Sequence, residues 1–323
     1  YKIKQYLLII ITSTVLGIYS VEFFLTMKKI NNDKLAQTES KKKKFDARSR
    51  VQVYQELKRK DEKVTLTVSL KDLYQDSNKK IYALSGLSNT KTIRCNETGD
   101  YSFFKSDRFG FNNPDDIWDK KKIKYLIIGD SFAEGACVNR PHDLRSVISN
   151  ISGKHALTLG VGGIGPLTEL ALLREYLTHE VENLIWLYYE GNDLRDLEVE
   201  LNNPILKKYF KDNLFTQNLK EKQKLINEIS RNHIRNKVEN IDKDKNNFNI
   251  DQKFFKLYHF RQFLHIYFSP NPNKNFKDII SKVLELTKKK NINLHFVYLP
   301  EYNRYNLKFY PNKNYTLIKA IIK

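Results

Sequence analysis

Metal-binding patterns are missing from this chain of 323 residues. The sequence has only 2 cysteines and 7 histidines, and no two of them have the close, regular spacing of a zinc motif such as His-x-x-x-His. We therefore expect no metal centre.

Nucleotide-binding motifs are missing as well. The glycine cluster Gly160-Val-Gly162-Gly163-Ile-Gly165 has neither the Lys and Ser/Thr of a P-loop nor the full spacing of a Rossmann fingerprint. The chain also has no internal repeat. We expect no nucleotide and no other cofactor.

Positive charge is abundant, with 56 Lys and Arg against 37 Asp and Glu and a net charge of +19. Such a charge can indicate a nucleic-acid partner. Here the lysines are dispersed, apart from Lys41–Lys44 and Lys288–Lys290, and the chain is rich in residues with AT-rich codons. We expect no nucleic-acid partner and only a mild attraction to anionic glycans or a membrane surface.

An apolar stretch from Tyr6 to Met27 contains one charged residue, Glu22. As a helix it would be about 33 Å long, enough to cross a bilayer. Lysines flank it on both sides, so charge does not fix its orientation. Since no clear cleavage site follows, residues 1–29 are predicted to be a transmembrane signal anchor with the membrane as partner, rather than a buried core helix.

The remaining sequence divides by composition. Residues 30–63 are polar and are predicted to form a linker or stalk, with a short helix near 51–62. Residues 64–122 carry short β-like runs broken by glycines and are interpreted as an irregular, β-containing lead-in. Residues 123–323 form the main predicted domain, and 195–265 are interpreted as a helical insertion within it.

Strand and helix patterns alternate in the main domain. Buried strands are predicted at 123–128, 155–161, 183–189 and 292–299, and helices at 144–151, 166–178 and 276–289. Right-handed crossovers would make the sheet parallel, with helices on both faces. The predicted fold class is α/β, a flavodoxin-like three-layer α/β/α parallel sheet with an N-terminal transmembrane helix and a helical insertion.

Ligands of open α/β sheets bind beyond the carboxyl ends of the strands. The first three predicted strands are followed by Gly129-Asp130-Ser131, by the glycine cluster 160–165, and by Gly191-Asn192-Asp193. Acyl transfer needs a hydroxyl, a base and donors for an oxyanion. Ser131 offers the hydroxyl, and the glycine loop and Asn192 offer donors. Alternatively, Ser131 is only a helix N-cap, and Asp193 caps the following helix.

These three motifs, in this order, resemble those of the SGNH (GDSL-like) hydrolases. The resemblance covers about residues 107–323, including the lead-in Asp107-Arg-Phe-Gly-Phe-Asn112. It implies that Ser131 attacks the acyl carbonyl, and that the N–H groups of Ser131 and Gly163 hold the oxyanion with the Asn192 amide. Asp130 and Asp193 would support the loops.

The sequence departs from the family pattern at two places. Thr158 replaces the asparagine often found in the second motif's strand, and no histidine has the Asp three residues before it that the Asp-x-x-His motif requires. His295 falls inside the fourth predicted strand. Because the chain starts at Tyr1 rather than Met and stops at Lys323, we expect a fragment whose catalytic His and Asp lie beyond Lys323. The alternative is a divergent or inactive site.

The predicted function is therefore an ester hydrolase or O-acyltransferase on acylated carbohydrate of the cell envelope or another small ester. It would be membrane-anchored with its catalytic domain outside the cytoplasm, in the periplasm. The alternative is a non-catalytic glycan-binding or assembly protein on a decayed SGNH scaffold.

Two further features of the sequence leave alternatives open. Cys95 and Cys137 would be either free thiols or, outside the cytoplasm, a disulfide. The aromatic residues of the insertion (Tyr258, Phe260, Phe263, Tyr267) are interpreted as core packing rather than a sugar platform.

Overall fold

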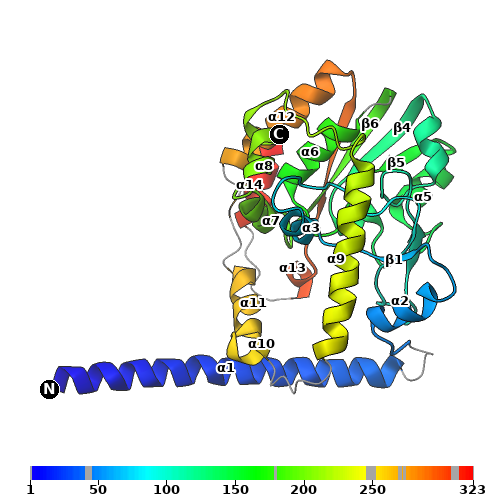
Figure 1. Ribbon diagram of the computed structural model, residues 1–323. Helices are drawn as coiled ribbons and strands as arrows, with labels where there is room; N and C mark the ends of the chain where they lie inside the picture. The colour runs from blue at the N-terminus through cyan, green and yellow to red at the C-terminus, as the bar shows by residue number, and fades with distance from the viewer. Residues whose placement is uncertain are drawn as a thin grey trace.

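The computed structural model describes residues 2–40, 46–177, 180–244, 252–267, 271, 274–306 and 313–322. An α/β body lies beside a long N-terminal helix, α1 (Lys2–Ser40), whose N-terminal part projects beyond the body (Figure 1). Within the described residues, the strands form one sheet of 4 strands and one of 3.

The larger sheet confirms the predicted α/β class. It contains β4 (Lys122–Ile128), β5 (Ala156–Thr158), β6 (Glu180–Tyr189) and β7 (Asn293–Leu299), all parallel, in the order β5-β4-β6-β7. The chain therefore crosses from one side of β4 to the other between β5 and β6. In a doubly wound sheet, this switch point is where the loops leave a crevice for a ligand.

Strand β5 is shorter than the prediction of 155–161. After Thr158 the backbone makes one further bond to β4, from the N–H of Leu159 to the carbonyl of Ile127 at 2.9 Å. It then leaves the sheet at Gly160, where a Cβ would lie 2.2 Å from the backbone nitrogen of Glu134. The helix that carries Glu134 occupies the space that a longer strand would need.

The helices that follow the strands confirm the predicted alternation. They are α4 (Ser131–Glu134), α5 (Leu144–Ser152), α6 (Pro166–Tyr176), α7 (Asp193–Glu200), α8 (Pro204–Lys211), α9 (Gln223–Asp244), α10 (Gln252–Phe255), α11 (Tyr258–Tyr267), α12 (Lys274–Lys289), α13 (Asn303–Asn306) and α14 (Lys313–Ile322). Helices α7 to α11 fall in the segment interpreted as a helical insertion.

Side chains of the parallel sheet alternate between two apolar clusters. Ile127 of β4 and Leu187 of β6 pack with Leu144 of α5 on one face. Their neighbours Leu126 and Trp186 belong to the main core, which includes residues of α6 and α12. Because side chains of a strand point alternately to its two faces, helices cover both sides of this sheet.

The lead-in forms a second small sheet beside the first. The lead-in contains β1 (Val64–Leu66), α3 (Leu70–Asp76), β2 (Lys91–Ile93), β3 (Phe103–Lys105) and the 3-10 helix η1 (Asp115–Asp119), and helix α2 (Arg50–Lys58) precedes it. Strand β1 is parallel to β2, and β3 is antiparallel to β2. This sheet has a core cluster of its own, formed with Val53 of α2 and Ile234 of α9.

Helix α1 is longer than the predicted anchor of residues 1–29. Residues Lys2–Lys28 are long and apolar enough to span a membrane or to act as a signal anchor. The helix then continues to Ser40, and α2 corresponds to the short helix predicted near 51–62, so much of the segment 30–63 is helical. The polar sequence 30–40 permits this continuation, because Lys, Leu, Ala, Gln and Glu all favour a helix and no Pro or Gly interrupts it.

The single acidic residue of the apolar stretch has a structural partner. Glu22 is fully buried, and its carboxylate accepts hydrogen bonds from the backbone N–H of His259 at 3.1 Å and of Phe260 at 2.6 Å. These are among the first N–H groups of α11, which have no acceptor within their own helix. Glu22 therefore caps α11 and fixes it against α1, as the adjacent ribbons in Figure 1 show.

Candidate functional site

Ser131 stands at the first position of helix α4, directly after β4. Gly129, at the end of the strand, has φ 145°, and a Cβ there would lie 2.8 Å from the carbonyl oxygen of Leu187. Only glycine fits this close passage between β4 and β6. The turn leaves Ser131 half-buried, with its hydroxyl donating a long hydrogen bond of 3.4 Å to Asp130.

Asp130 is the N-cap of the same helix and is only 2% exposed. Its carboxylate accepts a hydrogen bond of 3.1 Å from the backbone N–H of Phe132. Burial raises the pKa of Asp130, and hydrogen bonds from Phe132, Asn192 and Ser131 offset part of that rise. The loops after β4 and β6 thus meet at Asp130, which braces Ser131 and Asn192.

The loop after β6 is held by Asp193. This side chain is fully buried, and its carboxyl accepts a hydrogen bond of 2.8 Å from the N–H of Tyr189, four residues earlier. Burial raises the pKa of Asp193 well above its ordinary value, and the neighbouring carboxyl of Glu169 raises it further. Asp193 is therefore a structural brace of the turn that presents Asn192.

The amide of Asn192 lies between two carboxylates. Its nitrogen donates a hydrogen bond of 2.8 Å to Asp196, and its proximity to Asp130 lowers the pKa of that acid. An amide nitrogen carries two N–H groups. Asp196 and Asp130 thus engage both N–H groups of Asn192, and a substrate oxygen would have to displace one of these two carboxylates.

The glycine loop after β5 connects the other two loops. Gly162 is packed against Glu134 of α4, and Gly165 against α7, where a Cβ would lie 2.9 Å from the nitrogen of Leu197. Gly163 lies between these contacts in the chain, with φ 79°, and an added Cβ would meet open space. Its N–H makes no hydrogen bond with the described residues. The loop thus presents one exposed glycine between the helices that follow Ser131 and Asn192.

Two buried acids that sequence reasoning missed hold this loop in place. Glu134 accepts hydrogen bonds of 2.8 Å from the N–H of Gly162 and from the guanidinium of Arg94. Glu200 accepts bonds from the N–H groups of Gly165 at 2.6 Å and Leu167 at 3.1 Å, and also from the N–H and hydroxyl of Thr168. Burial raises the pKa of Glu134 and brings that of Glu200 to about 7.

Glu190, which directly follows β6, forms an ion pair with Arg304. Both oxygens of its carboxylate bind the guanidinium of Arg304 in α13, and the N–H of Glu301 donates to it at 3.1 Å. The two side chains are 3% and 12% exposed. Glu190 therefore joins the loops after β6 and β7 and has little surface left for a substrate.

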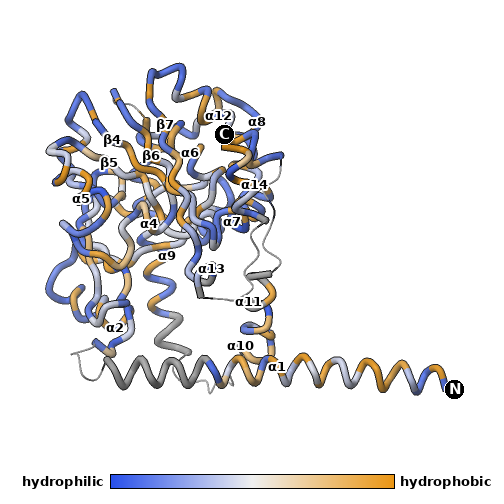
Figure 2. Tube along the Cα trace, turned by 180° about the vertical axis from the view of Figure 1, so that it is seen from behind, coloured by the Kyte–Doolittle hydropathy of each residue, from blue (hydrophilic) through white to orange (hydrophobic). Residues whose placement is uncertain are grey.

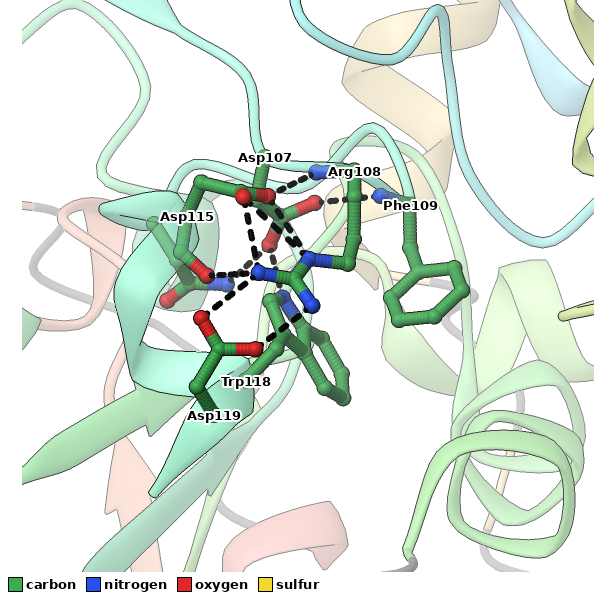
Figure 3. A network of polar contacts seen from close by, with 7 residues as sticks. Asp107, Arg108, Phe109, Asp115, Trp118 and Asp119 are labelled. Atoms are coloured by element: carbon green, nitrogen blue, oxygen red, sulfur yellow. Dashed lines mark hydrogen bonds and ion pairs between the residues drawn. The ribbon is translucent and has the colours of Figure 1, made fainter.

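The lead-in supports the end of β5 through Asp107, Asn113 and Thr158. Asn113 exchanges two hydrogen bonds of 2.9 Å with the backbone of Thr158, the position where an asparagine was expected. Asn113 also donates to Asp107 at 2.9 Å, whose surroundings Figure 3 shows. The segment that carries part of the SGNH resemblance thus acts here as a buried support for the glycine loop.

Cys95 and Cys137 form a disulfide, with their Cα atoms 5.0 Å apart. It joins the small sheet to the loop that follows α4. Among the described residues, the candidate group of metal ligands is Cys95, Glu97 and Cys137. Its two sulfurs are bonded to each other and offer no thiolate.

The described residues bring Ser131, Gly163 and Asn192 to one edge of the sheet but place no histidine against Ser131. His295 lies in β7, as predicted, and bonds to Asn183 at 3.0 Å, while His233 bonds to Asp76 at 2.7 Å. His179 lies outside the described residues. The hydrogen-bond partner of the Ser131 hydroxyl within the described part is Asp130.

Comparisons with protein-family models, with curated proteins and with solved structures found no match to this chain.

Proposed function

We propose that this protein is a membrane-anchored serine esterase or O-acyltransferase of the SGNH type. Its substrates would be acyl esters, with acylated carbohydrate of the cell envelope as the substrate class. Helix α1 would hold the catalytic domain on the periplasmic side of the membrane.

The observation that carries this proposal is the convergence of three strand-end loops at the switch point of the sheet. They supply a half-buried hydroxyl on Ser131, the backbone N–H of an exposed glycine, Gly163, and an amide on Asn192. Ser131 would attack the acyl carbonyl, and the N–H groups of Ser131 and Gly163 with the Asn192 amide would hold the oxyanion. One such donor typically contributes about 2.7–4 kcal/mol to transition-state stabilisation.

The disulfide and the apolar helix support the location. Disulfides persist mainly in oxidising compartments such as the periplasm, and the Cys95–Cys137 bond lies in the body that follows α1. The net charge of +19 favours approach to anionic glycans.

Replacing Ser131 with alanine tests the nucleophile. Because Ser131 has no histidine partner in the described structure, we expect little turnover of p-nitrophenyl acetate by this chain alone, and an increase when imidazole is added as an external base. Ser131→Ala is expected to abolish the protein-dependent part of that increase. Mass spectrometry of the parent chain should find acetyl on the peptide that contains Ser131.

The matched control is Ser69→Ala. Ser69 is also at a helix start, where its hydroxyl accepts the N–H of Asp72, so the change costs about 1 kcal/mol of helix capping without touching the site. Equal imidazole-dependent turnover in Ser131→Ala and Ser69→Ala would refute the assignment.

A pair of glycine variants tests the oxyanion loop. Gly163 and Gly153 both have positive φ, 79° and 63°, and open space around an added Cβ. Alanine at either position should cost about 1–2 kcal/mol of stability because of the left-handed backbone. Only Gly163→Ala should also reduce imidazole-dependent turnover, on the order of 10²-fold, because it displaces an oxyanion donor. Equal turnover in the two variants would exclude Gly163 from the site.

A second candidate function is a non-catalytic glycan-binding or assembly protein on the same scaffold. It is favoured by the internal bonds of Ser131 to Asp130 and of Asn192 to Asp196. In that case the chain would bind an acetylated oligosaccharide, Ser131→Ala would leave its affinity unchanged, and imidazole would produce no turnover.

A further inference from the structure

Helices α10 and α11 are attached to α1 at one level of its apolar stretch. Glu22 accepts the first N–H groups of α11, the hydroxyl of Tyr19 donates to the carbonyl of Phe255 at 3.1 Å, and the rings of Tyr19 and Phe254 lie 5.7 Å apart. Polar and aromatic contacts together therefore fix this pair of helices beside residues 19–22.

That level is close to the boundary of a bilayer, if α1 crosses one. No charged residue lies between Lys4 and Glu22. At 1.5 Å per residue this stretch is about 27 Å long, close to the roughly 30 Å of a hydrocarbon core. Glu22 would then mark one edge of the core, and the helices bound to it would lie at the same depth.

The direction of α11 fits that depth. In Figure 1 it runs across α1 rather than along it, so it would lie along the membrane surface instead of passing through it. Figure 2 shows apolar residues on α10 and α11 beside the apolar part of α1.

The composition of these helices also suits the boundary. Phe255 is 61% exposed and Tyr258 38%, and the basic residues Lys256 and Arg261 are exposed as well. Aromatic rings concentrate at membrane interfaces, and basic side chains attract anionic lipid headgroups. The aromatic residues of this segment, interpreted from sequence as core packing, are thus partly at the surface. The side chains of Phe263 and Tyr267 lie outside the described residues.

We propose that α10 and α11 form a membrane-interface platform that rests in the headgroup layer of a phospholipid bilayer containing anionic lipid. The platform would tie the protein to the membrane at a second element besides α1. This inference rests on the membrane anchor of the proposed function and is independent of the catalytic assignment.

Tryptophan fluorescence of the full chain in lipid nanodiscs tests the platform. The native tryptophans, Trp118 and Trp186, are 9% and 0% exposed in the body, so the parent chain supplies a background to subtract. Three single variants are compared, each with lipids that carry a quencher at a shallow or a deep acyl position. They are Phe255→Trp on the platform, Leu16→Trp on α1 and Leu214→Trp on the body, where Leu214 is 90% exposed.

We expect the indole of Phe255→Trp to lose most of its emission with the shallow quencher and little with the deep one. Leu16→Trp should be quenched most by the deep label, and Leu214→Trp by neither. If Leu16→Trp is quenched while Phe255→Trp behaves like Leu214→Trp, the platform is wrong and the anchor stands. Quenching of Phe255→Trp by the deep label would mean that the indole is buried in the hydrocarbon core. Blue-shifted emission without quenching would mean that it is buried under protein. Either result overturns the proposal. If Leu16→Trp is not quenched, the anchor fails, and the platform with it.

Discussion

Replacing Asp107 with alanine is expected to lower the free energy of unfolding by about 3–5 kcal/mol. Asp107 is fully buried and accepts hydrogen bonds from the N–H of Phe109 at 2.9 Å and from the indole of Trp118 at 2.7 Å (Figure 3). It also accepts from the N–H of Phe111 and from the Asn113 amide, both at 2.9 Å, which makes four hydrogen bonds. Alanine would leave all four donors without this acceptor. Each buried unsatisfied donor costs about 1–3 kcal/mol, although such costs do not add fully.

Asp115 and Asp119 provide the control within the same segment. Both form ion pairs with Arg108, but their side chains are 40% and 63% exposed. Alanine at either position should lower stability much less than Asp107→Ala, because solvent screens exposed ion pairs. Chemical denaturation of the three variants measures the difference. If Asp107→Ala loses no more unfolding free energy than Asp119→Ala, the buried hydrogen bonds of Asp107 contribute little to stability.

The stability contributed by Asp107 should also depend on pH. Burial raises the pKa of Asp107 from 3.8 to about 6, against the opposing effect of its four donors. Between these two values the unfolded chain has released the proton while the folded chain retains it. Stability therefore falls as pH rises from about 4 to about 6. The difference in unfolding free energy between parent and Asp107→Ala should shrink over this range and then become constant. Other buried acids change the unfolding free energy of the parent and of Asp107→Ala with pH in the same way, so they cancel in the difference.

The parallel sheet was predictable because its strands carry a local signal. Apolar runs gave β4, β6 and β7 to within three residues at each end, and a glycine follows closely after β4 and β6. The end of β5 was not predictable, because it depends on the approach of α4 to Gly160. Likewise, polarity alone could not tell the helical continuation of α1 from a flexible linker.

The candidate site was predictable only where its residues are neighbours in sequence. Asp130, Ser131, Asn192 and Asp193 stand in short motifs next to strands. The residues that hold the glycine loop act over much longer separations: 28 residues from Glu134 to Gly162 and 35 from Glu200 to Gly165. Only Glu134 had a local signal, since it lies one helical turn after Ser131. The pairing of Arg304 with Glu190, 114 residues apart, had none.

Removing the disulfide with the double variant Cys95→Ser, Cys137→Ser is expected to lower stability by about 4 kcal/mol. The bond joins residues 42 apart in sequence, and closing a loop of that length restricts the unfolded chain by about this amount in the chain-entropy description. A reductant should lower the melting temperature of the parent chain to that of the double variant. It should leave the melting temperature of the double variant unchanged. If the reductant does not affect the parent, the bond does not stabilise the folded protein.

The same variant should loosen the glycine loop before the chain unfolds. Arg94, next to Cys95, donates at 2.8 Å to Glu134, which in turn accepts the N–H of Gly162. Without the disulfide, the small sheet that carries Arg94 loses its covalent link to the loop after α4. We expect faster hydrogen exchange at the Gly162 amide, while that of Gly165, held by Glu200, should change much less. Equal acceleration at both amides would indicate general destabilisation. A change confined to Gly162 would show that the disulfide acts on the glycine loop through Arg94 and Glu134.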